Sequence, residues 1–314
     1  EITHELGVIR AVGAELTAAQ QAALQAHPAV RRLYVNHPVE TATNPNSEPT
    51  AEDETYETGT FNGYTEHPAR VAADQLHAQG LLGDGVTLAV LDSGLQAWPQ
   101  LVRDTSNRNR LLAHYDAIDD RLLHKSQYSD QSGHGTHVTS IVVDPSTDPA
   151  SGRFNGVAPN VNLVSVKAFD DNGQGSYADV IRGIDWLVAN QDTHGIRVLN
   201  LSFSAPPQSH YWDDPLNQAV MAAWQAGIVV VASAGNLGPD PMSIGVPGNL
   251  PYVITVGAMS DNYTPSDPSD DSLASFSAAG PTHEGFVKPD LLAPGGHVFG
   301  MMDWFAQIAK DQPE

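Results

Sequence analysis

Between residues 86 and 258, short apolar runs alternate with longer segments in which apolar residues recur every three or four positions. The runs are VTLAVLD (86–92), VNLVSVKAF (161–169), IRVLNLSFS (196–204), GIVVVASAG (227–235) and YVITVGA (252–258). Their β-branched character favours buried strands. Continuously apolar strands that are joined by helices predict a mainly parallel sheet, covered on both faces.

Two of the intervening segments have helical spacing, namely YADVIRGIDWLVANQ (177–191) and DPLNQAVMAAWQAG (214–227). In the first, Val180, Ile184 and Leu187 fall on one face of a helix. In the second, Gly227 is typical of a helix C-terminus. We therefore predict a doubly wound α/β fold, in which any site lies in loops at the carboxyl ends of the strands.

The first 36 residues predict a small α+β unit. Apolar GVIRAVGAEL is followed by LTAAQQAALQAHP, which has helical spacing, and then by AVRRLYVN, which we predict to be a strand. Thr17 is a suitable N-cap, with Gln20 three residues later. The unit is small for independent folding.

A second change of pattern divides the chain into three parts. Residues 37–66 contain seven acidic residues, no Lys or Arg, and little periodicity, which is typical of a flexible linker. We therefore expect a small unit over 1–36, an acidic linker over 37–66 and one large domain over 67–314.

Charge and composition exclude some classes of function. The formal net charge is -22, and the only lysines are Lys125, Lys167, Lys288 and Lys310, so no basic stripe is present to bind nucleic acid. No stretch approaches the roughly 20 apolar residues of a membrane helix. The absence of cysteine excludes disulfides, thiol catalysis and cysteine metal sites. An acidic surface suits an extracellular, marine or saline setting, although an ordinary acidic secreted protein has the same pattern.

Two polar residues stand directly after buried runs. Asp92 ends LAVLDSG, where Gly94 allows the chain to turn, and Asn236 follows VVVASAG. An asparagine amide at such a place could donate a hydrogen bond to a developing oxyanion. Both residues also have a structural interpretation, because aspartate and asparagine are common helix N-caps and turn formers.

The stretch QSGHGTHVTSIVVD (131–144) predicts an apolar helix over THVTSIVV, with His134 at its entrance. Gly133 and Gly135 keep other side chains away from His134. Because a helix N-terminus disfavours a protonated imidazole, His134 would need a nearby carboxylate to take part in proton transfer. His137 could share a zinc ion with His134, but no third ligand of suitable spacing follows. We interpret His137 as a packed or hydrogen-bonded helix residue.

An aspartate after the strand at 86–92, a histidine in HGTH and an asparagine in SAGN, in that order, resemble the subtilisin-like serine proteases. The resemblance continues through GDGVTLAVLDSG, GVAPNVNLVSVKAF, VLNLSFS, VITVGA, ASFSAAG and KPDLLAPGG, and spans about residues 66 to 300. It implies the same doubly wound α/β fold, with helices on both faces of the sheet. It also implies that residues 1–36 are part of an inhibitor-type propeptide and that the acidic linker contains the maturation site.

The resemblance assigns roles to three residues. It implies that Asp92 orients and stabilises the imidazole, that His134 acts as general base and then as general acid, and that Asn236 donates to the oxyanion. Subtilisin itself is the reference case for this chain order and for the asparagine.

The resemblance also assigns a surface for substrate. Ser202, Phe203 and Ser204 are similar to the strand along which an extended peptide would lie. The family usually has glycine at the position of Ser204, so the serine bears on how closely a substrate approaches.

In the family, the nucleophilic serine lies in a GTS motif after the segment that APGG resembles. No GTS follows Asn236, so we expect this chain to lack the nucleophile and to be inactive by itself. Ser132 and Ser140 lie near His134 in sequence, but nothing directs them at the oxyanion site. We expect a fragment of a longer, secreted serine endopeptidase. The alternative is a catalytically inactive subtilisin-like module that binds peptides.

The resemblance implies that no cofactor is required and that a structural calcium ion could bind. DNYTPSDPSDD (261–271) offers carboxylates without EF-hand spacing, and a solvated acidic loop is the alternative. A dinucleotide-binding enzyme is excluded, because no GxGxxG follows the strand at 86–92. The expected partners are a peptide or protein substrate and the chain's own propeptide as an intramolecular inhibitor, with neither nucleic acid nor a membrane.

Overall fold

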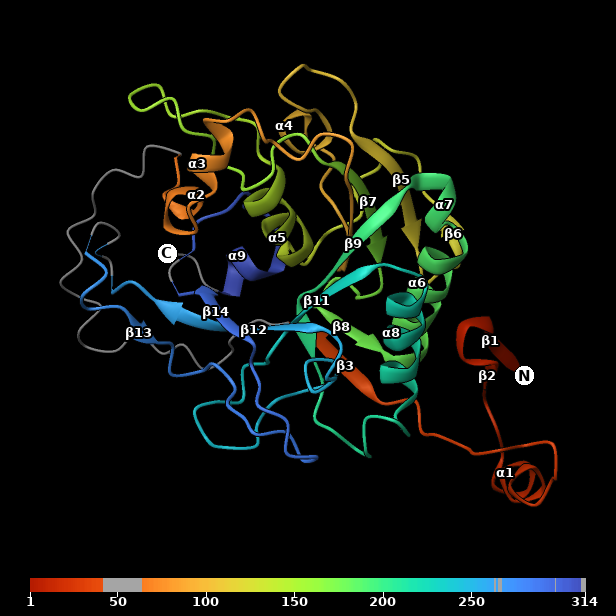
Figure 1. Cartoon of the computed structure of the whole chain (residues 1–314). Coiled ribbons are helices and arrows are strands. Elements are labelled where there is room, and N and C mark those ends of the chain that lie inside the picture. Colours follow the sequence, from red (N-terminus) through yellow and green to blue (C-terminus); the bar gives the residue numbers. More distant parts are fainter. Residues whose placement is uncertain (42–63, 263, 265–266, 297, 312–314) are drawn as a thin grey trace.

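The computed structural model describes residues 1–41, 64–262, 264, 267–296 and 298–311 (Figure 1). Its centre is a nine-stranded sheet with the order β13-β12-β11-β9-β4-β7-β5-β6, and β14 pairs with β12. The strands are β4 (Thr87–Asp92), β5 (Leu111–Asp116), β6 (Arg121–Leu122), β7 (Asn162–Lys167), β9 (Ile196–Leu201), β11 (Val229–Ser233), β12 (Ile254–Ser260), β13 (Ser272–Leu273) and β14 (Leu291–Pro294). All pairs are parallel except β12 with β13 and β5 with β6.

Each of the five apolar runs forms all or part of a strand, as predicted, and β12 continues two residues beyond its run. The run at 196–204 contains two, because β10 (Phe203–Ser204) leaves the large sheet after β9 and joins a smaller one. Strand β5, with the sequence LLAHYD, was not predicted from the apolar pattern. Its polar His114 and Asp116 are nevertheless buried, because β5 lies inside the sheet between β7 and β6.

The main helices are α5 (His134–Val143), α6 (Tyr177–Ala189) and α8 (Pro215–Gln225). Alternate residues of β4 pack into two separate cores. Leu91 lies in the larger core with residues of α6 and α8, whereas Val90 lies in the smaller core with Val143 of α5. Because helices cover both faces, the predicted doubly wound α/β fold is confirmed (Figure 1).

Shorter helices complete the domain: α2 (His67–Arg70), α3 (Ala73–His77), α4 (Pro99–Val102), α7 (Gln191–His194) and α9 (Gln307–Asp311). The segment that we predicted as one helix over 177–191 is divided between α6 and α7. As predicted, Gly227 follows the end of α8, with a left-handed φ of 91°.

The N-terminal residues form β1 (Ile2–Leu6), the 3-10 helix η1 (Gly7–Ile9), β2 (Ala11–Ala14), α1 (Ala18–Gln25) and β3 (Pro38–Thr41). The Thr17–Gln20 capping box is present. The predicted strand over 29–36 is wrong, since the strand is β3, two residues later. The segment that we expected to be a linker, 37–66, begins with the strand β3. Most of the remaining segment, residues 42–63, lies outside the described residues.

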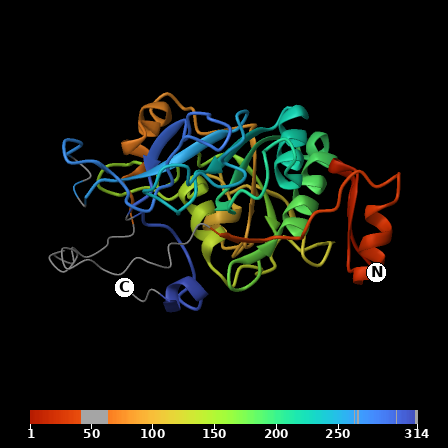
Figure 2. The same cartoon turned by 90° about the horizontal axis from the view of Figure 1, so that it is seen from below.

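The N-terminal unit lies at one end of the molecule, beside α6 and α8 (Figure 2). The carboxylate of Asp185 on α6 accepts hydrogen bonds from the backbone N–H groups of Gly7, at 3.0 Å, and Val8, at 2.8 Å. Arg182 donates to the carbonyl of Thr3 at 2.7 Å. The unit is therefore docked to α6 by polar contacts and, through Leu6, Val8 and Ile9, to the larger apolar core.

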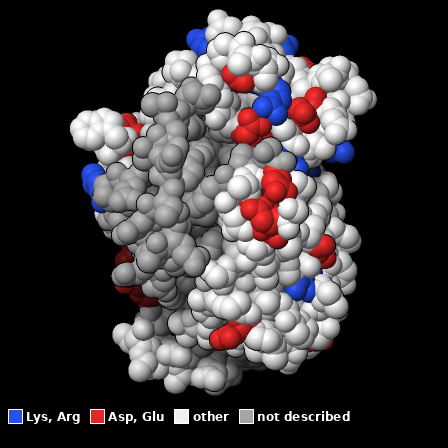
Figure 3. Space-filling view, turned by 90° about the vertical axis from the view of Figure 1, so that its left-hand side faces the viewer, with Lys and Arg blue, Asp and Glu red and all other residues white. Residues whose placement is uncertain are grey.

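The charged surface is divided into small clusters. On the face in Figure 3, basic side chains lie as isolated spots among acidic and uncharged ones. Within the described residues, no helix is both long and apolar enough to cross a lipid bilayer.

Leu199 tests the core. It is fully buried on β9 in the larger core, so Leu199→Ala should lower the free energy of unfolding by about 2–5 kcal/mol. The control Leu122→Ala removes a side chain that is 66% exposed and should change it by less than about 0.5 kcal/mol. Urea unfolding followed by circular dichroism measures both. Equal losses would contradict the described packing.

Candidate active site

The candidate residues collect at one edge of the sheet. Asp92 is the last residue of β4, Ser202 follows β9, and Asn236 stands three residues after β11. Since β11, β9 and β4 are neighbouring parallel strands, their carboxyl ends meet at the same edge. The sheet thus brings together residues that are up to 144 positions apart in the sequence.

Asp92 and His134 form a buried pair. Asp92 Oδ1 lies 2.7 Å from His134 Nδ1 and also accepts a 2.7 Å hydrogen bond from the backbone N–H of Ser93. The side chains are 1% and 10% exposed. Because Nδ1 is bound to the carboxylate, the second ring nitrogen, Nε2, is left to exchange a proton with another group.

Two glycines let the beginning of α5 approach the end of β4. Gly94 has a φ of 122°, and a Cβ placed on it would meet the carbonyl oxygen of Ser129 at 2.7 Å. A Cβ on Gly135 would meet the backbone of Gly94 and Asp92 Cβ, the latter at 3.2 Å. The close contact that these glycines allow brings His134 within hydrogen-bonding distance of Asp92.

A buried carboxylate, Asp130, holds the two segments together. Asp130 Oδ1 accepts from Ser93 Oγ and from the N–H of Gly133, each at 2.8 Å, and Oδ2 accepts from Thr136 N at 2.8 Å and Oγ1 at 2.6 Å. Ser93 Oγ in turn accepts from the N–H of Gly135 at 2.9 Å. Asp130 thus binds donors at the N-terminus of α5 and the residue after Asp92.

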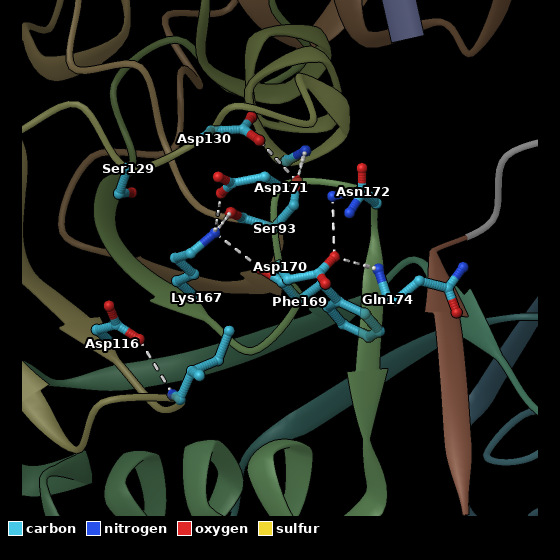
Figure 4. A network of polar contacts seen from close by, with 12 residues as sticks. Ser93, Asp116, Ser129, Asp130, Lys167, Phe169, Asp170, Asp171, Asn172 and Gln174 are labelled. Atoms are coloured by element: carbon cyan, nitrogen blue, oxygen red, sulfur yellow. Dashed lines mark hydrogen bonds and ion pairs between the residues drawn. The ribbon is translucent and has the colours of Figure 1, made fainter. Parts of the chain in front are cut away.

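Lys167, at the end of β7, extends this network. Its Nζ donates to the carbonyls of Ser93, at 3.0 Å, and Phe169, at 2.8 Å, and lies 3.7 Å from Asp171 (Figure 4). Neither Asp130 nor Lys167 was predicted from the sequence to be part of the site. Their sequence signals were weak: an aspartate four residues before His134, and a lysine that ends a buried strand.

The charge around His134 favours its protonated form. Burial by itself lowers the pKa of the imidazole, but the charge of Asp92, its hydrogen bond and the charge of Asp130 outweigh burial and raise the pKa above the ordinary 6.5. The carboxylate that we expected beside this helix N-terminus is therefore present. His134 can take up a proton while it remains buried.

His137 points elsewhere. Its Nε2 donates to the carbonyl of Val298 at 3.1 Å. Burial lowers the pKa of its imidazole, and repulsion by His134 acts in the same direction. This contact agrees with a hydrogen-bonded helix residue. No group of three or more His, Asp and Glu side chains within the described residues is arranged to hold a metal ion.

Ser202, Phe203 and Ser204 lie along a strand edge that is already paired. β10 and β8 (Gln174–Ser176) flank β3, and both pair with it in the antiparallel sense. Thr41 lies opposite Phe203, whose ring is fully buried against Phe169 at a centroid distance of 5.2 Å. The groove between β10 and β8 thus accepts an extended peptide segment, here from the chain's own N-terminal part.

The two serines near His134 in sequence differ in their contacts. Ser140 Oγ donates to the carbonyl of His137 and accepts from the N–H of Met301, each at 2.7 Å. Ser132 is buried, and its carbonyl accepts from the N–H of Ile308 at 3.1 Å. Within the part of the chain that the structure describes, no hydrogen bond reaches His134 Nε2.

The acidic stretch 261–271 is not arranged as a cation site in its described residues. Asp271 pairs with Arg70 at 2.6 Å, and both carboxylate oxygens of Asp270 accept from Thr264 Oγ1. These carboxylates therefore already have protein partners.

Comparison with known proteins agrees with the geometry. The sequence model of the subtilase peptidase family, Peptidase_S8, matches residues 83–313. Serine protease AprX of Bacillus subtilis (strain 168) is 39% identical over 241 residues, which are 75% of this chain and 52% of AprX. Subtilisin DY of Bacillus licheniformis is 33% identical, over 73% of this chain and 71% of that protein. The chain therefore spans about half the length of AprX.

Two solved structures share the fold. Sphericase superimposes with a TM-score of 0.57 and 26% identity, over 70% of this chain and 69% of sphericase. The S41 psychrophilic protease gives the same TM-score and coverage at 29% identity.

Asp92→Asn tests the charge at the site. Because the amide carries no charge, the pKa of His134 should fall, as measured by NMR titration of its ring nitrogens. The exposed control Asp119→Asn should leave it unchanged. Since folding raises this pKa, the pair stabilises the fold below the unfolded value of about 6.5, and this contribution is lost as pH rises through the folded value. An unchanged pKa in Asp92→Asn would contradict the described pair.

Proposed function

The chain belongs to the subtilase family, and from this premise we propose that the whole protein is a secreted serine endopeptidase in which Asp92 and His134 work with a serine. The observation that carries the proposal is the buried 2.7 Å contact between Asp92 and His134 at the carboxyl edge of the sheet. The raised pKa of His134 supports it, because a general base must accept a proton during attack.

The proposed mechanism follows from the orientation of the imidazole. His134 Nε2 removes the proton from the serine hydroxyl as its oxygen attacks the substrate carbonyl, and later gives that proton to the leaving amine. Asp92 holds the Nδ1–H tautomer and stabilises the imidazolium. Asn236 donates to the oxyanion that forms on the carbonyl.

The proposal needs a nucleophile that the described residues do not place at His134 Nε2. We assign it to a serine of the whole protein in the GTS motif that is typical of the family. Secretion is part of the same proposal and is supported by the family and by the acidic, lysine-poor composition.

The N-terminal segment is proposed as the intramolecular inhibitor, with residues 1–36 as the propeptide unit, maturation within 37–66 and the catalytic domain from 67. Support comes from β3, which lies in the groove where an extended substrate would pair with β10 and β8. Val39 of β3 is 1% exposed and belongs to the larger core. The segment therefore blocks the groove while it stays docked.

The catalytic proposal is tested in the product of the whole gene. A fluorophosphonate probe should label one serine, and a fluorogenic peptide should be cleaved. His134→Ala should lower kcat by about 10⁶-fold, a magnitude established for the histidine of subtilisin, a member of this family, rather than a value specific to this chain.

The matched control is His137→Ala, which removes the same ring from the same helix. We expect it to lower stability while the labelled serine remains reactive. Activity that survives in His134→Ala but is lost in a folded His137→Ala protein would reverse the assignment. A reading frame without a GTS serine, together with no labelling, would favour the inactive peptide-binding module.

The inhibitor proposal is tested at β3. Val39→Glu places a charge in the core, so β3 should dock less tightly and the whole protein should hydrolyse peptide with a shorter lag than the wild type. The neighbouring control Glu40→Gln changes an exposed side chain and should keep the wild-type lag. Progress curves measure both. An unchanged lag in Val39→Glu would argue against inhibition by this segment.

A further inference from the structure

The side chain of Ser204 lies in a gap between β10 and the two segments that contain Gly235 and Gly245, next to Asn236. A Cβ placed on Gly235, which directly precedes Asn236, would lie 3.1 Å from Ser204 Oγ. A Cβ placed on Gly245 would lie 2.9 Å from Ser204 Cβ. Ser204 therefore fills the space between β10 and the two segments that carry these glycines.

Main-chain hydrogen bonds fix the width of this gap. Ala205 and Val246 exchange two bonds, of 3.0 and 2.8 Å, which tie β10 to the segment of Gly245. The N–H of Gly245 donates to the carbonyl of Ala234 at 3.0 Å, which ties that segment to the end of β11. Widening the gap would break these bonds, so its size depends on the side chain at position 204.

The register of β3 shows where a substrate side chain would fall. Glu40 lies opposite Ser204, and Thr41 lies opposite Phe203. Residues directly opposite in an antiparallel pair share a face, and so do residues two apart along one strand. In a peptide bound in this register, one residue lies opposite Phe203, as Thr41 does. The side chain of the next residue of that peptide then lies on the same face as Ser204.

That side chain belongs to the residue to which we assign the scissile carbonyl. Thr41 N donates to the carbonyl of Gly173 at 3.0 Å, and a Cβ on Gly173 would lie 2.6 Å from Thr41 Oγ1 and 3.6 Å from Ser132 Oγ. Ser132 stands two residues before His134. A peptide running as β3 does therefore continues toward the loop that carries His134, and we take its next carbonyl as the scissile one.

We propose that Ser204 determines specificity, because it restricts the substrate residue that supplies the scissile carbonyl to the small side chains of Gly, Ala or Ser. This inference rests on the proposed endopeptidase function. A methyl group adds a single carbon on this face, whereas a leucine or phenylalanine side chain would have to occupy the volume that Ser204 fills. In the sequence, Thr41 is followed by Ala42, a residue of the proposed size.

The test uses the whole protein and fluorogenic peptides of sequence Val-Glu-Thr-X, with X as Ala, Leu or Phe. The wild type should cleave the Ala peptide with the highest kcat/KM. Ser204→Gly should raise kcat/KM for Leu and Phe relative to Ala by about 10–200-fold, the range that one methylene in a hydrophobic pocket is worth. Ser204→Ala keeps Cβ and should retain most of the preference.

Ser209→Gly, the same type of change at an exposed position, should leave the ratios unchanged. Fluorophosphonate labelling reports the nucleophile independently of X. A labelled protein whose ratios are equal in the wild type and Ser204→Gly would overturn the role of Ser204 and leave the endopeptidase function standing. A protein that is not labelled and cleaves none of the peptides would overturn the function itself, and this inference with it.

Discussion

The buried contact between Asp92 and His134 is the interaction on which the site depends. An imidazole at the N-terminus of a helix is disfavoured as a cation, and burial disfavours it further. Asp92 reverses this balance at 2.7 Å, so that the pKa of His134 lies above its ordinary value. A charge pair in such surroundings needs fixed geometry, because misplacing either group would leave a buried charge without a partner.

The fold provides that geometry through neighbouring backbone segments. The parallel order of β11, β9 and β4 brings the candidate groups to one edge, and glycines allow α5 to approach the end of β4. Asp130 then ties the loop before α5 to the residue after Asp92 through its hydrogen bonds. These contacts orient the imidazole before any substrate is bound, which is the preorganisation that proton transfer requires.

The second constraint is the pair of strand edges formed by β10 and β8. Two facing edges with unpaired backbone groups form a natural site for a third strand, and β3 of the chain itself fills it. The same main-chain pairing suits an inhibitor segment and a substrate, because backbone hydrogen bonds do not depend on side-chain identity. Side chains such as Ser204 must then supply the discrimination between peptides.

The sequence alone determined the class of fold and the principal candidates. Continuous apolar runs are typical of strands covered on both faces of a parallel sheet, so β4, β7, β9, β11 and β12 were predictable. So was the helix with His134 at its entrance. Tertiary structure decided what short-range patterns do not encode. The polar strand β5 is buried because of its neighbours, and the pairing partner of β10 was set by β3, more than 160 positions away. Asp130 and Lys167 joined the site because their partners come from other strands and loops. Hydrophobic periodicity reports the burial of an element, whereas the contacts of a single polar side chain depend on the residues that the completed fold places around it.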